Sequence, residues 1–289
     1  MPQPQLPPDI AAVVARALEE DVGPGDVTAD LVPADRRARA TVVSREDAVL
    51  CGAAWFDEVF AQLDPAVSVA WEVNDGATIA AGTVLCRLEG PARPLLSGER
   101  TALNFLQSLS GTATIARRYV DQVAGTGCRV LDTRKTLPGL RAAQKYAVAC
   151  GGGTNHRRGL YDAILIKENH IFAAGGIAAA LAAARAAHPE LSVEIEVESL
   201  DELEAALDGQ ADIVLLDNFT LELLREAVTR TRSRRGCATR LEASGNVELA
   251  NVRAIAETGV DFVSVGGLTK HLRAVDLSMR FRLADADPA

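Results

Sequence analysis

The chain has 289 residues, 48% of them hydrophobic, and a formal net charge of −9 at pH 7. A chain of this length and composition can form two domains, or one large barrel with an additional unit, around a sizeable core. Its acidic balance argues against nonspecific nucleic-acid binding, which needs a basic surface.

The N-terminal segment, the longest weakly polar run and the cysteines bear on the compartment. Residues 1–10 contain neither the basic nor the apolar segment of a signal peptide, and the run 171–184 is too short and too mild to span a bilayer. The five cysteines are an odd number without CxxC spacing, which argues against a disulfide framework and against a structural zinc site. We therefore expect a cytoplasmic protein.

The N-terminal part of the chain predicts an α+β domain over residues 1–111. Helical patterns lie near residues 9–22, 52–62 and 94–108, and strand patterns lie near residues 39–50, 66–73 and 83–88. At the other end of the chain, hydrophobic and polar residues alternate from Val275 to Leu283, which is typical of a strand with one buried face. We predict that this strand, within residues 272–289, returns to complete the N-terminal sheet.

Residues 112–271 predict a β/α barrel. Short apolar runs typical of strands alternate with helical patterns. The strand-like runs lie at residues 129–131, 162–166, 191–198, 212–216, 239–243 and 260–265. Strand then helix, repeated about six times, indicates a parallel sheet, and the count and the short loops favour a closed barrel. The active site of such a barrel lies at the carboxyl ends of its strands.

Cationic side chains gather within residues 132–170 of this acidic chain. The segment holds seven lysines and arginines against three acidic residues, and it contains three of the four lysines of the chain. Five side chains near predicted strand ends are candidates for binding a small polyanion: Arg134, Lys135, His156, Arg157 and Lys167. Guanidinium groups suit this role because they bind carboxylates and phosphates bidentately.

Two glycine-containing turns follow later strands and are candidates for binding phosphate. Ser244, Gly245 and Asn246 precede a predicted helix, whose free N–H groups and dipole favour an anion. Gly266 and Gly267 form a second turn of the same kind. Loops after the last strands of such barrels commonly hold phosphate.

Carboxylates at two strands are the candidate partners of a metal ion. Alternation along VEIEVES places Glu194, Glu196 and Glu198 on one face of a strand. Carboxylates that point into a barrel need cations or a divalent ion as partners. We expect Glu196 and Asp217 to bind Mg²⁺, which prefers oxygen ligands and shared phosphates.

Other roles for the cationic segment stay open. It can be a solvated helix face, and His156 can be a hydrogen-bonded turn residue. Lys167, which follows the apolar run AILI, can instead form a Schiff base as in barrel aldolases. A third interpretation is that the protein is a noncatalytic anion sensor. His170 and Asn169 favour a role in capping the following helix. Solvated or structural roles are favoured for Arg141, Lys145 and Arg158.

The motif DTRKTLPGLRAAQKYAVACGGGTNHRRGLYDAILIKENH closely resembles the quinolinate phosphoribosyltransferase family. The likeness extends to EEDVGPGDVT, GERTALNFLQSLSGTAT, VEIEVES, DIVLLDN, EASGN and SVGGLT, so it covers nearly the whole chain. It implies an N-terminal α/β sandwich with a partly open parallel β/α barrel, assembled as a homodimer. It also implies an enzyme that joins quinolinate to 5-phosphoribosyl-1-pyrophosphate with Mg²⁺, releasing pyrophosphate and CO₂ and giving nicotinate mononucleotide for NAD synthesis. A paralogous phosphoribosyltransferase that uses another aromatic acid is the alternative.

The resemblance also implies residue roles. By similarity, the two quinolinate carboxylates are held by Arg100, Arg134, His156 and Arg157, with Thr133 in the same pocket. Lys135 and Lys167 neutralise carboxylate or pyrophosphate charge, and Arg100 enters the site of the partner subunit. Catalytic roles fall to Lys135, Lys167, Glu196 and Asp217, of which the two acids also contact the ribose and Mg²⁺.

The phosphate cradle of the family corresponds to residues 244–246 and 266–267. This sequence departs from the family there in two places: Asn246 stands where the family usually has glycine, and GGLTKH replaces GALTHS. These departures leave open whether Lys270 or His271 reaches the phosphate.

Overall fold

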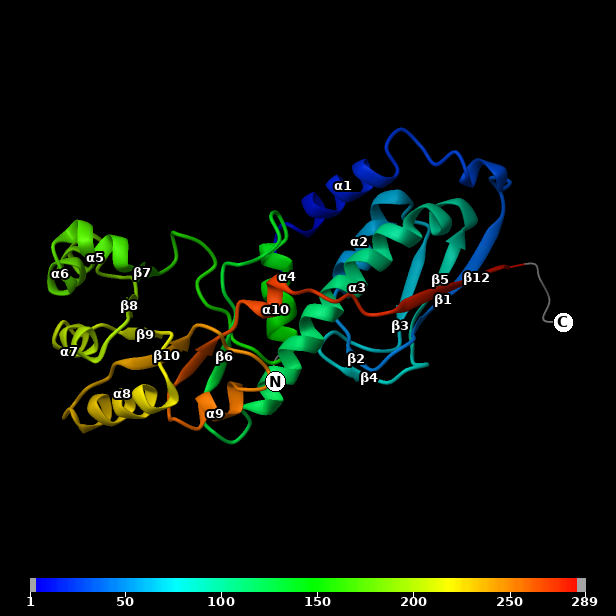
Figure 1. The fold of residues 1–289 in the computed structure, drawn as a ribbon. Coiled ribbons are helices and arrows are strands. Elements are labelled where there is room, and N and C mark those ends of the chain that lie inside the picture. The colour runs from blue at the N-terminus through cyan, green and yellow to red at the C-terminus, as the bar shows by residue number, and fades with distance from the viewer. Residues whose placement is uncertain (1–3, 285–289) are drawn as a thin grey trace. The chain divides into compact units, whose positions relative to one another are not determined.

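The computed structural model describes residues 4–284, which form two compact units (Figure 1). Of the described residues, unit 1 comprises 4–117, 136–152 and 269–284, and unit 2 comprises 118–135 and 153–268. The predicted domains 1–111 and 112–271 differ from these units mainly at residues 136–152, which belong to unit 1. Residues 285–289 of the predicted C-terminal strand segment, and residues 1–3, lie outside the described part.

Unit 1 is an α+β unit built on an antiparallel sheet in the order β12-β1-β5-β3. Its strands are β1 (Arg37–Ser44), β2 (Ala48–Val49), β3 (Ser68–Trp71), β4 (Thr78–Ile79), β5 (Val84–Pro91) and β12 (Leu277–Leu283). Its helices are α1 (Ile10–Asp21), the 3₁₀ turn η1 (Ala29–Leu31), α2 (Ala53–Leu63), α3 (Ala92–Gln122), whose last residues belong to unit 2, and α4 (Arg141–Cys150). The C-terminal strand β12 thus pairs with β1, with Ala40 opposite Phe281.

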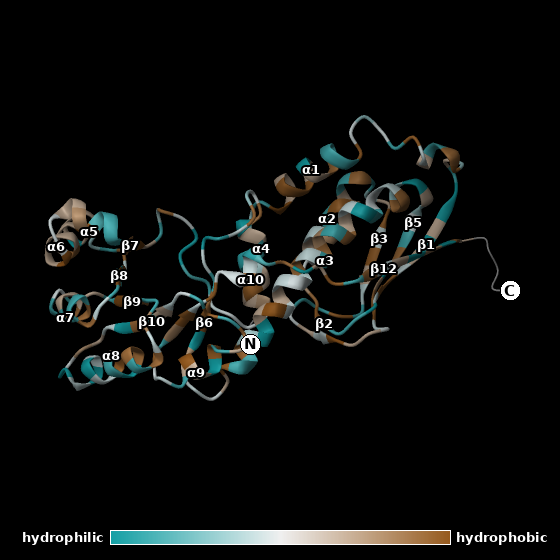
Figure 2. Ribbon diagram, in the orientation of Figure 1, coloured by the Kyte–Doolittle hydropathy of each residue, from teal (hydrophilic) through white to brown (hydrophobic). Residues whose placement is uncertain are grey.

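The core of unit 1 explains why residues 136–152 belong to it. Tyr146 and Ala147 of α4 are buried in the same hydrophobic cluster as Trp55 and Phe56 of α2, and the rings of Trp55 and Tyr146 lie 5.4 Å apart. Figure 2 shows hydrophobic residues along α2 and along strands of this sheet. The segment therefore buries its apolar face in unit 1, although it connects two strands of unit 2.

Helix α3 is much longer than the predicted helix near residues 94–108. It continues through Gly111, where a side chain would collide with unit 1: an added Cβ would lie 2.2 Å from the carbonyl oxygen of Arg273. Glycine is a poor helix former, so the sequence pattern favours an end near this position. The close approach of the chain at Arg273 gives the glycine its structural role.

Unit 2 contains six parallel strands in the order β6-β11-β10-β9-β8-β7. The strands are β6 (Arg129–Leu131), β7 (Ile164–Ile166), β8 (Val193–Val197), β9 (Ile213–Asp217), β10 (Arg240–Ser244) and β11 (Phe262–Ser264). The helices are α5 (Glu168–Ala174), α6 (Ile177–Ala187), α7 (Leu200–Asp208), α8 (Leu221–Ser233), α9 (Val252–Ala256) and α10 (Gly267–Lys270), whose last residues belong to unit 1. All six predicted strands are confirmed.

The sheet of unit 2 is open, so the closed barrel expected from the strand count is wrong. Within residues 4–284, β6 and β7 are the two edge strands and do not pair with each other. Six strands are fewer than the eight of a closed β/α barrel. The partly open β/α architecture implied by the family resemblance is confirmed.

In the described part of the chain, no single helix is long and apolar enough to cross a membrane. Among the helices of residues 4–284, only α5 and α6 taken together have the length and composition of a membrane span, and a 90° bend separates them.

Candidate functional site

The strand-end pocket is a cavity of about 180 Å³ at the carboxyl ends of the unit 2 strands. It brings together eight of the predicted site residues: Thr133, Arg134, Lys135, His156, Arg157, Lys167, Glu196 and Ser244. Four further residues complete the lining: Leu165, Leu215, Glu242 and Ser264. The pocket thus contains the cations that the sequence gathers in residues 132–170.

Two arginines contribute positive charge to the pocket. The buried Nε of Arg134 has no hydrogen-bond partner among the described residues. Burial lowers the pKa of Arg157 from its ordinary value, and the charge of Arg134 adds to this effect. A carboxylate or phosphate bound between the two guanidinium groups would neutralise their mutual repulsion.

Lys167 pairs with Glu196 at the ends of the neighbouring strands β7 and β8. The Lys167 side chain is 48% exposed and that of Glu196 is 16% exposed, so the ammonium group remains accessible to a ligand. The backbone N–H of Lys167 donates to Nδ1 of His170 at 3.0 Å, at the start of α5. The predicted capping role of His170 is therefore confirmed.

The His156 ring lies next to two buried carboxylates, those of Glu194 and Glu242. Its Nε2 is 2.7 Å from Oε2 of Glu194 and 3.7 Å from Oε2 of Glu242, whose side chains are 5% and 1% exposed. Burial raises the pKa of Glu242 well above its ordinary value, and the Glu194 carboxylate adds to the shift, whereas a hydrogen bond from Ser264 opposes it. Glu194, one of the alternating glutamates of VEIEVES, therefore has His156 as its hydrogen-bond partner.

Residues 244–246 form a turn next to Asp217 and not the start of a helix. Ser244 lies opposite Asp217 in the β9–β10 register, and a Cβ on Gly245 would lie 2.1 Å from Oδ1 of Asn218. The helix expected directly after Asn246 begins only at Val252. Its predicted first turn is replaced by side-chain bonds of Asn251, which accepts from the N–H of Glu248 at 2.8 Å and donates to the carbonyl of Asn246 at 2.9 Å.

The remaining predicted residues lie around the pocket or in the other unit. Gly266 follows β11, and a Cβ there would lie 3.0 Å from Cδ of Lys135. Gly267 begins α10. Arg100 belongs to α3 in unit 1, so it is not among the residues that unit 2 brings together.

The favoured structural roles of the other cations fit their positions. Lys145 is 2% exposed in α4, and the Arg141 Nε–H donates to Oγ1 of Thr136 at 3.1 Å, both within unit 1. The backbone N–H of Arg158 donates to Asp162 at 2.7 Å, and this arginine does not line the strand-end pocket.

Sequence reasoning missed Glu242 and Ser264 as site residues. The signal for Glu242 was present, because Arg240, Glu242 and Ser244 alternate with Leu241 and Ala243 as the glutamates of VEIEVES alternate with their apolar neighbours. Ser264 ends β11 as Ser244 ends β10.

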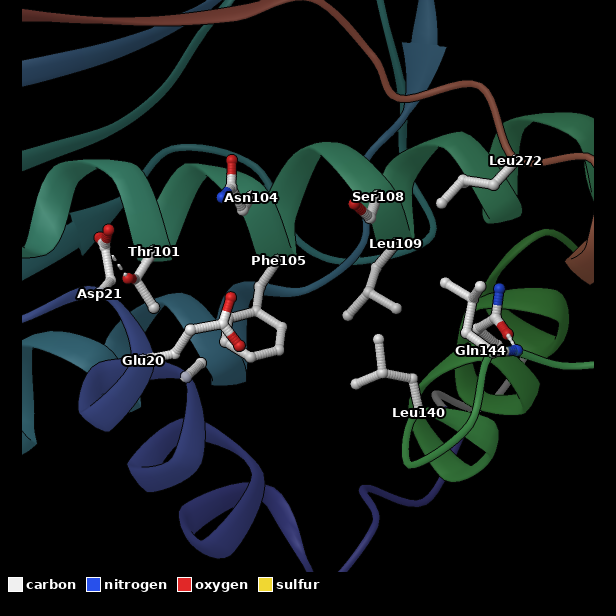
Figure 3. Close-up of a pocket in the computed structure, with 12 residues that line it drawn as sticks. Glu20, Asp21, Thr101, Asn104, Phe105, Ser108, Leu109, Leu140, Gln144 and Leu272 are labelled. Carbon is white, nitrogen blue, oxygen red and sulfur yellow. Dashed lines mark hydrogen bonds between the residues drawn. The ribbon is translucent and has the colours of Figure 1, made fainter.

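Unit 1 has a cavity of its own, of about 200 Å³, lined by α1, α3 and α4 (Figure 3). Glu20, Asp21 and Phe105 lie toward one side, and Leu109 and Leu140 face each other farther along. The Asp21 carboxylate accepts a hydrogen bond from Thr101 at 3.0 Å. No predicted site residue lines this cavity, and its carboxylates do not suit an anionic substrate.

Comparison with known proteins agrees with this arrangement. The sequence matches the profiles of quinolinate phosphoribosyl transferase, N-terminal domain, over residues 26–110 and C-terminal domain over residues 112–280. It is 44% identical over 272 residues to the carboxylating nicotinate-nucleotide pyrophosphorylase of Mycobacterium leprae, covering 92% of this chain and 95% of that protein. A probable enzyme of the same name from Bacillus subtilis is 39% identical, covering 92% and 91% of the two chains.

Solved structures give the same result. The nicotinate-nucleotide pyrophosphorylase from Francisella tularensis superposes with a TM-score of 0.92 at 46% identity, covering 96% of this chain and 98% of that one. The two matching profiles together span both parts of the chain, and the likeness holds in sequence and in fold. The chain belongs to the quinolinate phosphoribosyl transferase family.

Proposed function

We propose that this chain joins quinolinate to 5-phosphoribosyl-1-pyrophosphate and releases CO₂ and pyrophosphate, giving nicotinate mononucleotide for NAD biosynthesis. The observation that carries the proposal is the pair of guanidinium groups in the strand-end pocket, with the buried Nε of Arg134 left without a partner. A dianionic aromatic acid supplies negative charge opposite this pair, and its carboxylates accept hydrogen bonds from guanidinium groups.

The acceptor is held by the cations of the pocket. Arg134 and Arg157 bind the carboxylates, and Lys135 and Lys167 neutralise the charge that remains on the acceptor and on the pyrophosphate. Thr133 and His156 complete the wall of this subsite. An acidic chain binds two anionic substrates in this way because its cations are concentrated at one site.

The chemistry needs orientation and charge neutralisation more than proton transfer. The ring nitrogen of quinolinate attacks the ribosyl carbon as the bond to pyrophosphate breaks, through an oxocarbenium-like centre. The carboxylate next to the ring nitrogen then leaves as CO₂, and its bonding electron pair stays on the ring carbon. The neighbouring pyridinium nitrogen stabilises this pair until a proton replaces the carboxylate, so no dedicated general base is required for bond formation.

Glu196 and Asp217 fit the role of Mg²⁺ ligands by the chemistry of their donors. They are partly exposed carboxylates at the ends of the adjacent strands β8 and β9, and Mg²⁺ takes few protein oxygens together with water and substrate phosphates. When bound, the ion supplies positive charge to the leaving pyrophosphate. The turns at residues 244–246 and 266–267 offer backbone N–H groups to the phosphates.

The assembly we propose is a cytoplasmic homodimer in which Arg100 reaches the strand-end pocket of the partner subunit. The support is that Arg100 lies in unit 1, whereas every residue of the pocket lies in unit 2. An additional guanidinium group would then contact the acceptor only in the assembled dimer.

The Schiff-base alternative gains no support from the position of Lys167. A lysine nucleophile is activated by burial in an apolar pocket or by a neighbouring cation. Lys167 is half exposed, and its ion-pair partner is the carboxylate of Glu196. A paralogous enzyme that uses another aromatic acid remains the second candidate, since the same cations suit any aromatic dicarboxylate.

The direct test is a product assay with the purified chain. Quinolinate labelled in the carboxylate next to the ring nitrogen is incubated with 5-phosphoribosyl-1-pyrophosphate and Mg²⁺, and CO₂, pyrophosphate and nicotinate mononucleotide are measured. The proposal expects the three products in equal amounts. Absence of CO₂ release under these conditions, with the protein folded, would reject it.

A further inference from the structure

Residues 154–157 lead into the strand-end pocket without forming a helix or a regular strand. The backbone ties them to β6 by an isolated bridge: the N–H of Thr154 donates to the carbonyl of Val130 at 2.8 Å, and the N–H of Asp132 donates to the carbonyl of Thr154 at 3.2 Å. This regular pairing does not extend to Arg157. The segment therefore needs side-chain contacts to keep the Arg157 backbone in a fixed position.

The side chain of Asp132 continues the attachment where the backbone pairing stops. Its Oδ1 accepts the backbone N–H of His156 at 2.8 Å, and its Oδ2 accepts an Nδ2–H of Asn155 at 2.7 Å. Both distances are at the short end of the range for N–H···O hydrogen bonds. Asp132 is 0% exposed and does not line the pocket, so it holds the segment without contacting a substrate.

Asp132 also adjoins the second guanidinium group of the pocket. Arg134 follows it by two residues, just after β6, so one buried carboxylate joins the chain segments that carry Arg134 and Arg157. Burial, and then the charge of Arg134, lower the pKa of Arg157, which shows that the two cations repel each other. The two segments must be held together against this repulsion when no anion is bound.

We propose that Asp132 is a positioning residue for the dicarboxylate acceptor, which fixes Arg157 relative to Arg134 before the acceptor binds. A pocket whose two cations are already in place binds a dianion without the free-energy cost of ordering the segment. This inference rests on the proposed function, because it concerns the same acceptor. The competing interpretation is that Asp132 contributes to the stability of unit 2 and has no effect on acceptor binding.

The first experiment breaks the contact between Asp132 and Asn155 from each side. In Asp132→Asn, an amide nitrogen replaces one of the two oxygen acceptors, so one donor loses its partner. In Asn155→Asp, two carboxylates face each other. Each variant is expected to raise KM for quinolinate about tenfold or more, with kcat and KM for the phosphoribosyl donor changed less than about threefold.

The double variant Asp132→Asn/Asn155→Asp places a donor opposite an acceptor again. The amide at position 132 donates to the carboxylate at position 155, and its oxygen accepts the backbone N–H of His156. The inference expects KM for quinolinate to return to within about threefold of the wild-type value, although each single variant is impaired. A double variant as impaired as the two single variants combined would overturn it.

The matched control is Asp212, an aspartate at the other end of the unit 2 strands. It precedes β9, its Oδ2 accepts the backbone N–H of Val193 at 2.8 Å, and it does not line the strand-end pocket. Asp212→Asn is expected to lower the melting temperature and to leave KM for quinolinate unchanged. If Asp132→Asn also changes the melting temperature alone, its role is structural and the inference is wrong.

Binding of benzene-1,2-dicarboxylate, measured by calorimetry, separates this inference from the proposed function. If the wild-type protein binds this probe without converting quinolinate, the proposed function fails, and a Kd about tenfold higher in Asp132→Asn still supports the positioning role. Equal Kd values for these two proteins would reject the positioning role even in an active enzyme. Failure of an inactive wild-type protein to bind the probe would reject both.

A further variant keeps the inference testable if the double variant does not fold. Asn155→Ala removes one of the two donors and leaves the buried carboxylate of Asp132 in place. It is expected to raise Kd for benzene-1,2-dicarboxylate at least about fivefold. An unchanged Kd in the folded Asn155→Ala protein would overturn the inference.

Discussion

At the scale of single residues, the cations of the strand-end pocket should matter for activity and not for stability. Lys167→Ala and Arg157→Ala each remove a charge-assisted contact worth about 1.5–3 kcal/mol, which is roughly a ten- to hundredfold loss in kcat/KM. The melting temperature should change little, because both side chains line a pocket and not a packed core. Arg158→Ala is the control, since this neighbouring arginine is exposed outside the pocket. A fall in melting temperature with unchanged kcat/KM would contradict the assignment.

The buried Glu242 makes a prediction for the pH dependence of stability. Its pKa is raised in the folded protein, so the folded state keeps a proton that the unfolded state loses above its ordinary pKa of about 4.3. The free energy of unfolding should therefore fall as pH rises from that value toward the folded pKa, by up to about 1.4 kcal/mol per pH unit for this group. Glu242→Gln removes this contribution.

Urea unfolding of both proteins between about pH 5 and 8 checks the prediction. The stability of Glu242→Gln relative to the wild type should increase with pH. Parallel pH profiles would show that Glu242 does not retain its proton in the folded state.

At the scale of elements, Gly111 is predicted to be essential for the long helix α3. Alanine is a better helix former than glycine by about 1 kcal/mol, but its Cβ would meet the carbonyl oxygen of Arg273 at 2.2 Å. Gly111→Ala should therefore destabilise the protein by about 1–3 kcal/mol in urea unfolding. Asn104→Ala, at an exposed position of the same helix, should be neutral or slightly stabilising. Stabilisation by Gly111→Ala would argue against the close approach.

Several elements of the fold and much of the pocket could be predicted from the sequence. The six strands of unit 2 follow from apolar runs, and the cationic pocket follows from residues that end them. Neither the open edge of the sheet nor the burial of Tyr146 in unit 1 could be predicted, because both depend on packing between distant segments. The start of α9 at Val252, and not directly after Asn246, could not be predicted, because side-chain hydrogen bonds of Asn251 take the place of backbone ones in the preceding turn.

At the scale of the whole molecule, the proposed dimer predicts complementation between two variants of strongly reduced activity. Arg100→Ala and Lys167→Ala are unfolded together and refolded as a mixture. If Arg100 acts across the interface, each mixed dimer regains one intact site, so random pairing gives about a quarter of wild-type activity. If Arg100 acts within its own chain, every site keeps one lesion. No recovery of activity, with mixed dimers confirmed by mass, would reject the shared site.

The central claim is that the cations of the strand-end pocket are arranged for an aromatic dicarboxylate, and acceptor discrimination tests it most directly. The measurement is kcat/KM for quinolinate and for nicotinate, which lacks one carboxylate, at saturating 5-phosphoribosyl-1-pyrophosphate and Mg²⁺. A site whose buried charges are left unpaired by the smaller acceptor should prefer quinolinate by about 100-fold or more. Equal values of kcat/KM for the two acceptors would contradict the account.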